Sequence, residues 1–490
     1  MQLNPFSSVR RPALGGRLGA VAAAHPLATA AGQQLLAEGG NAVDALIAAQ
    51  AALAVVTPDA CGIGGDGFVL LRRPGRPVIA VNGAGPSARA ATEAATTGGA
   101  SVTVPGLVDL WDHLSVEAGR LGLARALQPA IEIAEQGVRA DEGLLAARDG
   151  QAERLRAGGA ETWDLMRLAL GDRFVQPALA RVLGQIGQHG RAALYEGEIA
   201  AAIARAVQGT GGALSEEDLA PPVAELKEPL SLRLGDRVLH VQPPQSQGVL
   251  LLMALNGFHQ GGFAPGASLA HLAVELTQAA FAHRDDAGRG EVLLQERLEV
   301  DPERAQRRGG PRAYLHTAGV TAADAEGNVA SSLVSVFDDF GSAVFVPEGG
   351  FTLTNRAAGF TGGANIFAPG QRPVHTLAPA LLETPDGAVA LSTPGADGQV
   401  QTLLQVILDW TVAGRDLTEA VAAPRWRSED GKLLIEAGHG ARDDLRARGH
   451  EVVELPPGDV RFGAMTVSGM HDGTPFALAD WRRMTWAGVA

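Results

Sequence analysis

Apolar residues recur at intervals of three and four positions over residues 26–38, near the start of the chain. This spacing predicts a helix, and Gly39 and Gly40, which follow it, are typical of a helix end. Asn41, with an acidic residue three positions later, has the pattern of a capping box and predicts the start of a second helix. Residues 45–55 are apolar on nearly all sides, so we expect this second helix to be buried.

Short apolar runs between turn residues predict strands in several places. These runs are residues 68–71, 78–81, 230–234 and 237–241. Helical patterns cover residues 105–208, a segment from 249 past 255, and residues 268–283. Residues 284–312 are the most polar part of the chain, and we expect a mobile surface stretch there.

The amino-acid composition indicates which residues fill the core. Hydrophobic residues make up 46% and charged residues 19% of the 490 residues, as in soluble globular proteins. The 63 glycines and 28 prolines show no G-X-Y period, which excludes a collagen-like chain. Since only 4% of the residues are aromatic, Ala, Leu and Val must fill most of the core, and this favours helices packed closely against sheets.

The charge balance bears on possible partners. Forty Lys and Arg residues against 54 Asp and Glu residues give a formal net charge of -14, which argues against nucleic acid and an anionic membrane surface and favours a small molecule. Cys61 is the single cysteine, so no internal disulfide can form, which is consistent with a reducing compartment. Neither a signal peptide nor a membrane-spanning apolar run is found, and the sequence predicts a cytoplasmic protein.

No metal ion or organic cofactor is predicted. The 12 histidines are dispersed, and the strings H-E-x-x-H, C-x-x-C and G-x-x-x-x-G-K-[ST] do not occur. Residues 62–67 match the G-x-G-x-x-G string of dinucleotide-binding loops, but a helix precedes them and a strand follows, which is the reverse of that motif. We interpret these glycines as positions where the backbone passes close to another segment or a substrate.

Residues 317–335 alternate in polarity on both sides of a turn at 325–327, which predicts a β-hairpin. Thr317 lies at the mouth of the first strand and Ser335 near the end of the second. A threonine hydroxyl is a poor nucleophile without a base, but a threonine that becomes a chain N-terminus can use its own α-amine. That would require cleavage of the bond between His316 and Thr317. Threonine is also common in strands because of its β-branched shape, so the residues alone leave a structural role open.

Several segments carry a pattern that extends through the chain. They are residues 24–28 (A-H-P-L-A), 39–45 (G-G-N-A-V-D-A), 62–68 (G-I-G-G-D-G-F), 104–106 (V-P-G), 243–248 (P-P-Q-S-Q-G), the hairpin at 317–335, Phe340-Gly341, Asn355-Arg356, Pro379, Pro394-Gly395 and 423–425 (A-P-R). Together, and in this order, they resemble the γ-glutamyltransferase family of N-terminal-nucleophile (Ntn) hydrolases.

The resemblance implies an α+β fold, an αββα Ntn-hydrolase sandwich made as one precursor domain that cuts itself before Thr317. The large subunit would be residues 1–316 and the small subunit residues 317–490, each the partner of the other. In the precursor, the hydroxyl of Thr317 would attack the carbonyl of His316. In the mature enzyme, the freed amine would act as general base while the hydroxyl attacks a substrate amide and forms an acyl-enzyme, which water hydrolyses or an amine accepts.

The resemblance also implies roles for residues outside the first strand of the hairpin. Ser335 would place a second hydroxyl beside the nucleophile, where the family usually has threonine. The backbone N–H groups of Gly395 and Ala396 would form the oxyanion hole, with alanine in place of a second glycine. His375 and Thr376 align with a serine pair that meets the substrate carboxylate, and a structural role for His375 in a turn stays open.

The substrate pocket departs from the family pattern. Asn82 stands where glutamyl-specific members have an arginine for the substrate α-carboxylate, and Phe337 and Ala358 stand where they have an asparagine and an aspartate for the α-amine. These changes remove the groups that would bind the α-carboxylate and the α-amine of a glutamyl substrate. A zwitterion buried in the pocket needs such charged or polar partners. Residues near enough in sequence to substitute are Arg89, Arg356, Asp338 and Asp339.

Three hypotheses for the function follow. The first is hydrolysis, favoured over transfer, of γ-glutamyl amides such as glutathione-like compounds. The second is hydrolysis of another acyl amide, either a dicarboxylic monoamide or a substrate of the cephalosporin-acylase kind. The third is an unprocessed, inactive scaffold or binding protein.

Overall fold

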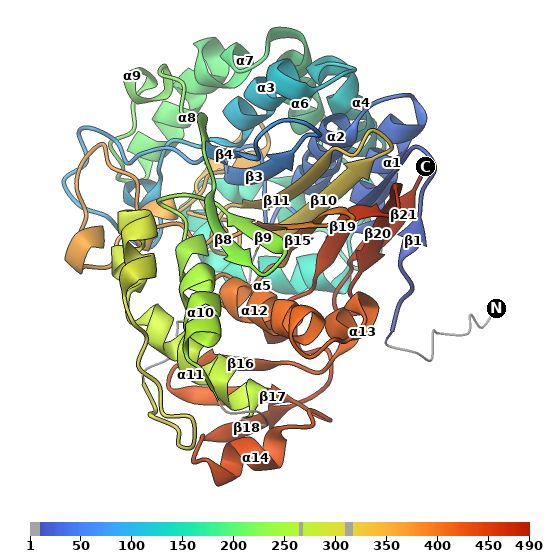
Figure 1. Cartoon of the computed structure of the whole chain (residues 1–490). Coiled ribbons are helices and arrows are strands. Elements are labelled where there is room, and N and C mark those ends of the chain that lie inside the picture. Colours follow the sequence, from blue (N-terminus) through green and yellow to red (C-terminus); the bar gives the residue numbers. More distant parts are fainter. Residues whose placement is uncertain (1–9, 264–267, 309–316) are drawn as a thin grey trace.

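Two β-sheets stacked face to face form the centre of the molecule, and helices cover both outer faces (Figure 1). The computed structural model describes residues 10–263, 268–308 and 317–490. The arrangement of helices, sheet, sheet and helices is the α+β sandwich that the resemblance implied, so this expectation is confirmed.

The first sheet, called the hairpin sheet below, has the predicted Thr317 hairpin at its centre. Its seven strands, in spatial order, are β21 (Trp486–Val489), β2 (Gly19–Ala23), β10 (Ala318–Asp324), β11 (Val329–Ser335), β3 (Asp66–Arg72), β4 (Ile79–Gly83) and β7 (Glu225–Lys227). All neighbouring strands are antiparallel. The predicted hairpin is therefore confirmed as β10 and β11, in the middle of the sheet.

The second sheet also has seven antiparallel strands. In spatial order they are β1 (Leu14–Gly15), β20 (Thr474–Ala479), β19 (Thr466–His471), β15 (Gly387–Ser392), β14 (Ala380–Thr384), β9 (Arg237–Val241) and β8 (Leu230–Leu234). Strands β8 and β9 have the bounds that the apolar runs predicted.

Helices share an apolar core with the outer face of each sheet. Those on the hairpin sheet are α1 (Pro26–Ala37), α2 (Ala42–Val56), α3 (Leu107–Ala118), α4 (Leu123–Gln136), α6 (Pro177–His189), α7 (Ala192–Tyr195) and α8 (Gly197–Gly209). Those on the second sheet are α10 (Gly248–Gln260), α11 (Leu269–Phe281), α12 (Gly398–Thr411) and α13 (Leu417–Ala422). Within the described ranges, no helix is both long enough and apolar enough to cross a membrane.

The remaining helices and strands are short or peripheral. They are α5 (Glu142–Ala157), α9 (Glu216–Leu219), α14 (Arg442–Ala447), the two-stranded pairs of β5 (Val138–Arg139) with β6 (Arg173–Phe174) and of β12 (Phe345–Val346) with β13 (Phe351–Thr352), and a three-stranded sheet of β16 (Trp426–Glu429), β17 (Lys432–Glu436) and β18 (Val452–Leu455).

Helix α2 begins at the predicted capping box. The side chain of Asn41 accepts hydrogen bonds from the N–H groups of Val43 and Asp44 at 3.0 and 3.2 Å, and Asp44 accepts one from the N–H of Asn41 at 2.9 Å. Every residue of α2 is buried, as its apolar pattern predicted.

The layer between the two sheets is closely packed because its side chains are small. Ala20, Ala22 and Ala477 form one apolar cluster there. A Cβ atom added to Gly319 would lie 2.7 Å from the hydroxyl oxygen of Ser392 in the facing sheet. The structure thus agrees with the expected core of small side chains.

The expectation of a mobile surface stretch over residues 284–312 is wrong for its first part. Residues Arg284–Gln295 form 3-10 turns that pack against α10, with Ala287 and Leu293 buried. Apolar residues inside this polar segment provide the anchor, and Arg284 binds Asp397 at 3.2 Å. Residues 309–312 of the stretch lie outside the described residues.

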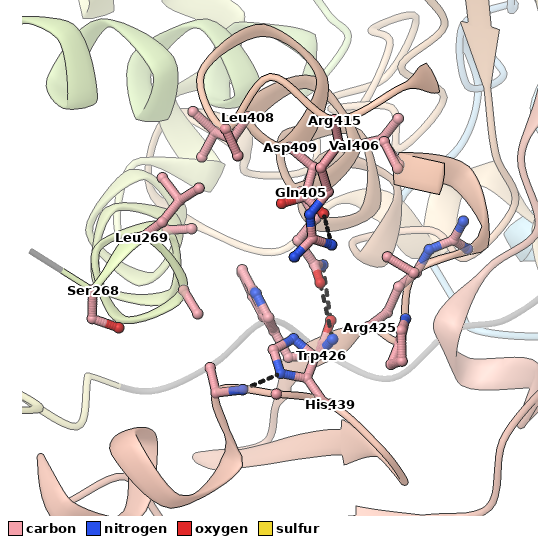
Figure 2. A pocket seen from close by; sticks show the side chains of 18 of the residues that line it. Ser268, Leu269, Gln405, Val406, Leu408, Asp409, Arg415, Arg425, Trp426 and His439 are labelled. Atoms are coloured by element: carbon pink, nitrogen blue, oxygen red, sulfur yellow. Dashed lines mark hydrogen bonds and ion pairs between the residues drawn. The ribbon is translucent and has the colours of Figure 1, made fainter. Parts of the chain in front are cut away.

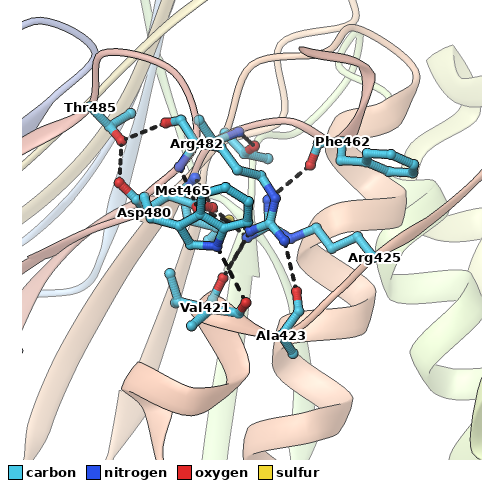
Figure 3. A network of polar contacts seen from close by, with 12 residues as sticks. Val421, Ala423, Arg425, Phe462, Met465, Asp480, Arg482 and Thr485 are labelled. Atoms are coloured by element: carbon cyan, nitrogen blue, oxygen red, sulfur yellow. Dashed lines mark hydrogen bonds and ion pairs between the residues drawn. The ribbon is translucent and has the colours of Figure 1, made fainter. Parts of the chain in front are cut away.

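A buried network of charges joins elements of the C-terminal third of the chain (Figure 3). Asp480 accepts hydrogen bonds from Arg425 at 2.5 Å and from Arg482 at 3.0 Å, and Arg482 also binds Glu436 at 2.5 Å. Burial alone would raise the pKa of Asp480, but Arg425 and Arg482 hold it below its usual value. Two guanidinium groups and two carboxylates therefore compensate one another away from water.

Replacing Asp480 by asparagine should destabilise the chain, because it leaves buried positive charge uncompensated. We expect a loss of about 3–5 kcal/mol in the free energy of unfolding. Urea unfolding of the Asp480→Asn variant, made in a Thr317→Ala background to exclude self-cleavage, measures this loss. The matched control is Asp472→Asn, which changes an exposed carboxyl group. Equal midpoints for the two variants would contradict the prediction.

Candidate active site

Three polar side chains form a row across the central strands of the hairpin sheet. The register of β10 against β11 ends with Ala318 opposite Val334, and one further step along it places Thr317 opposite Ser335, which pairs with Asp66 of β3. Residues at alternate positions of the same strands, Thr321 and Ser331, form hydrogen bonds with the facing sheet. Because side chains alternate along a strand, the row of Thr317, Ser335 and Asp66 also faces the space between the sheets, and all three residues are buried.

Ser335 fixes the turn that follows the second strand of the hairpin. Its hydroxyl oxygen accepts a hydrogen bond from the backbone N–H of Phe337 at 2.9 Å. Phe337 has a φ of 84°, in the left-handed region that a bulky residue rarely adopts. The hydroxyl that lies opposite Thr317 therefore also holds the backbone that positions Phe337.

The predicted oxyanion residues lie in the turn between β15 and α12. Gly395 has a φ of 125° and Ala396 a φ of 47°, and neither backbone N–H donates a hydrogen bond to another residue in the described ranges. The side chain of Gln247 donates to the carbonyl of Ala396 at 2.9 Å and so holds the turn by its oxygen. Both N–H groups thus remain available as donors, which fits the predicted role.

His375 is bonded within a turn and to a carboxyl group of the row. Its Nδ1 accepts a hydrogen bond from the N–H of Leu377 at 3.1 Å, so Nε2 carries the proton and donates it to Asp66 at 3.2 Å. Burial, and then Arg356, lowers the pKa of His375 well below its usual value. Burial raises the pKa of Asp66 to about 8, against the opposing effect of Arg356. Both side chains are therefore neutral near pH 7, and the contacts of His375 favour its structural role.

Two of the predicted pocket residues make only local contacts. Asn82, in β4, accepts a hydrogen bond from the N–H of Ala84 at 3.0 Å. It pairs with Phe68, which lies two residues from Asp66 along β3. Ala358 lies in the 3-10 turn Arg356–Gly359 and brings no polar group to the site.

The other two pocket residues, Phe337 and Thr376, meet at Arg356. The guanidinium carbon of Arg356 lies 3.7 Å from the centroid of the Phe337 ring, and its Nη1 donates to the hydroxyl of Thr376 at 3.3 Å. Arg356 is 1% exposed, and burial lowers its pKa to about 10. Arg89, by contrast, has an exposed side chain beside Asp218. Of the two arginines named as substitutes, the structure thus brings Arg356 to the predicted pocket.

Sequence reasoning missed two charged residues of this region. Asp66 belongs to the glycine-rich segment at 62–68, which the resemblance included without a role for the aspartate. Arg284 lowers the pKa of Arg356 by its charge and therefore lies near it, although the polarity of its segment suggested only surface. His316, the other residue of the predicted cleavage site, lies outside the described residues.

A cavity of about 480 Å³ lies elsewhere, between α11, α12 and the β16–β17 pair (Figure 2). Leu269, Gln405, Trp426 and His439 are among its lining residues, and none of the row residues is. Burial lowers the pKa of His439 to about 4. This cavity is separate from the candidate active site.

One group of side chains in the described part of the chain has the spacing of metal ligands. His271, Glu275 and His450 are buried, and their ligand atoms lie within 4.8 Å of one another. His271 and His450 form a 2.8 Å hydrogen bond, and Arg308 lies 3.6 Å from Glu275. These contacts give the three side chains partners without an ion, and the absence of a metal stays a prediction.

Comparisons with known proteins agree over nearly the whole chain. The family model described as gamma-glutamyltranspeptidase matches residues 28–489. The acylase ACY 1 proenzyme of Pseudomonas sp. is 33% identical, with 97% of this chain and 94% of the relative covered. The oxamate amidohydrolase proenzyme of Klebsiella pneumoniae is 32% identical, with 89% and 92% covered. The crystal structure of cephalosporin acylase from Bacillus halodurans superposes with a TM-score of 0.90 at 27% identity, covering 100% of this chain and 99% of that one.

An αββα sandwich with a buried hydroxyl residue at the start of a central strand is the architecture of an Ntn hydrolase. The chain belongs to the γ-glutamyltranspeptidase family, as the resemblance of its motifs implied.

Asp66 should make the stability of the chain depend on pH. Its pKa of about 8 in the folded chain exceeds that of an unfolded aspartate, so the folded chain keeps a proton that the unfolded chain releases. Stability contributed by this group therefore falls as the pH rises from about 4 to about 8. Asp66→Asn removes this titration but keeps the shape of the protonated acid.

Urea midpoints of the parent and of Asp66→Asn, both in the Thr317→Ala background, measure this effect. We expect the difference between them to move in favour of the variant from about pH 5 to about pH 8. A difference that stays constant over this range would show that Asp66 is ionised in the folded chain.

Proposed function

We propose that this chain is a self-processing amidohydrolase with Thr317 as its nucleophile, acting on an amide whose acyl group has no α-ammonium. Family membership supports the amidohydrolase and its self-processing. The choice of acyl group rests on the contact between Phe337 and Arg356. Phe337 occupies the position at which glutamyl-specific members are expected to bind the substrate α-amine. An ammonium beside this buried cation would be repelled. The relatives named acylase and oxamate amidohydrolase support the same choice.

Self-cleavage would start from the intact bond between His316 and Thr317. The hydroxyl oxygen of Thr317 attacks the carbonyl carbon of His316, the C–N bond breaks, and the nitrogen takes the proton and becomes the α-amine. Water then opens the resulting ester, which restores the hydroxyl and leaves a carboxylate on His316. The products are the large subunit, residues 1–316, and the small subunit, residues 317–490.

In the mature enzyme, the α-amine of Thr317 takes the proton of its own hydroxyl as the oxygen attacks the substrate carbonyl. The N–H groups of Gly395 and Ala396 stabilise the oxyanion that forms, and the leaving amine takes the proton. Ser335, opposite Thr317 and tied to the turn at Phe337, positions the nucleophile. Water hydrolyses the acyl-enzyme and releases the acid.

A second candidate is hydrolysis of γ-glutamyl amides, which the description of the matching family favours. It requires a site for the α-amine other than Phe337 and Ala358. The predicted cytoplasmic location belongs with either candidate and stays a prediction.

Self-cleavage makes a direct prediction for the purified protein. Denaturing electrophoresis should show two bands, with the smaller chain beginning at Thr317 by N-terminal sequencing. Thr317→Ala removes the attacking hydroxyl and should leave one full-length band. The matched control, Thr474→Ala, changes an exposed threonine of β20 and should be cut normally. One uncut band for the unaltered protein after long incubation would favour the inactive scaffold instead.

The choice of acyl group can be tested with two anilides that differ only in the α-amine. We expect glutaryl-p-nitroanilide to be hydrolysed with a kcat/KM at least about tenfold above that of γ-glutamyl-p-nitroanilide, because the charge of Arg356 repels the α-ammonium. Addition of glycylglycine as acceptor should leave the rate of p-nitroaniline release unchanged. Faster turnover of the γ-glutamyl compound would instead favour the second candidate.

A further inference from the structure

Arg356 is a buried cation that uses few of its hydrogen-bond donors. Its Nη1 donates to Thr376, and the face of its guanidinium lies on the ring of Phe337. Its Nε and Nη2 have no hydrogen-bond partner in the described part of the chain. A guanidinium has several N–H donors, and leaving them unpaired in a buried place is costly. This arrangement calls for an acceptor that the chain itself does not supply.

In the described part of the chain, no carboxyl group near Arg356 forms an ion pair with it. Burial keeps Asp66 protonated near pH 7, since its pKa is about 8. The charges of Asp338 and Asp397 raise the pKa of Arg356, but neither carboxylate binds it directly, and Asp397 binds Arg284 at 3.2 Å. Arg356 itself forms no ion pair within 4.0 Å in the described ranges, and a pKa of about 10 keeps it charged at neutral pH. A buried charge of this kind favours binding of an anion.

The unpaired donors lie on one edge of the guanidinium. Nε and Nη2 point to the same side, and together they match the two oxygens of a carboxylate. Gly359 faces this edge, because a Cβ atom there would lie 2.5 Å from Nη2 and 2.9 Å from Nε. Any larger residue at position 359 would collide with the guanidinium, so only glycine lets this turn pack beside the buried edge.

The edge lies close to the predicted nucleophile. Phe337, which supports the guanidinium, is two residues beyond Ser335 and is bonded to its hydroxyl. Ser335 in turn lies opposite Thr317, at the spacing of neighbouring strands, about 5 Å. An acyl group attached to Thr317 therefore needs only a short chain to pass Phe337 and reach Arg356.

We propose that the Nε and Nη2 edge of Arg356 binds the free carboxylate of the acyl donor, so that the substrates are dicarboxylic monoamides. Thr376 and Phe337 orient the guanidinium. Arg356, in the 3-10 turn Arg356–Gly359, would thus bind the carboxylate that an arginine at position 82 in β4 would otherwise bind. The choice of substrate class rests on the proposed function, whereas carboxylate binding by Arg356 does not.

Binding can be measured without any turnover. We expect isothermal titration to detect glutarate, the acid product, but not butyrate, which lacks the second carboxylate. Arg356→Gln should weaken glutarate binding by about tenfold to a hundredfold, and Arg356→Lys, which keeps the charge but not the fork, by less. The matched control is Arg89→Gln, since Arg89 is exposed and lies beside Asp218. Equal binding by Arg356→Gln and the control, or no binding of glutarate by the unaltered protein, would overturn the proposal.

Steady-state kinetics can distinguish carboxylate recognition by Arg356 from a purely structural role. For Arg356→Gln we expect the KM for glutaryl-p-nitroanilide to rise by about tenfold or more, and kcat/KM to fall at least about tenfold further for the glutaryl than for the butyryl compound. An equal loss on both substrates would assign Arg356 a structural role only. Gly359→Ala, which places a methyl group against the same edge, should also weaken glutarate binding and leave butyryl hydrolysis nearly unchanged.

The two proposals fail in different ways. If the chain neither cuts itself nor hydrolyses an anilide, but binds glutarate through Arg356, the proposed function is wrong and the carboxylate site stands. If the chain hydrolyses butyryl and glutaryl anilides equally well through Thr317, the function stands and the carboxylate site is wrong.

Discussion

The antiparallel pairing of β10 between β2 and β11 fixes the position of Thr317, and the arrangement of the site depends on it. The register of this pairing sets Thr317 opposite Ser335, and the next pairing sets Ser335 opposite Asp66. A shift of β10 by one residue would turn Thr317 toward the helices on the outer face, away from the side on which Ser335 and Asp66 lie. Buried strands on both sides, and the small residues of the layer between the sheets, make such a shift costly.

Buried arginines occur in two different surroundings, in the network of Arg425 and Arg482 and at Arg356. Arg425 and Arg482 each face a carboxylate, Asp480 or Glu436, and this network is structural. No carboxylate of the described residues forms an ion pair with Arg356, and under our proposal its charge serves a ligand. The same residue type thus serves stability where its partners belong to the chain and recognition where they do not.

Elements with a local signal could be predicted from the sequence. The capping box at Asn41 and the alternation around residues 325–327 each lie within a few residues, and the structure has the predicted helix and hairpin. The contact between Phe337 and Arg356 could not be predicted, since it depends on a left-handed turn after β11 and on a separate 3-10 turn. Arg284 was missed for a related reason, because a polar segment gives no sign that it is anchored by two buried apolar side chains.

The order of strands in the sheets has a consequence for the lifetime of the protein. Strands from before and after residue 317 alternate in the hairpin sheet, where β10 and β11 lie between β2 and β3, and both kinds also share the second sheet. Once the bond before Thr317 is cut, the two chains stay interleaved, but neither holds a complete sheet by itself. The precursor folds as one molecule. After cleavage and unfolding, the large and small subunits would have to associate again in solution before they could refold. Under the proposed cleavage, the persistence of the two-chain form would therefore depend on a slow rate of unfolding.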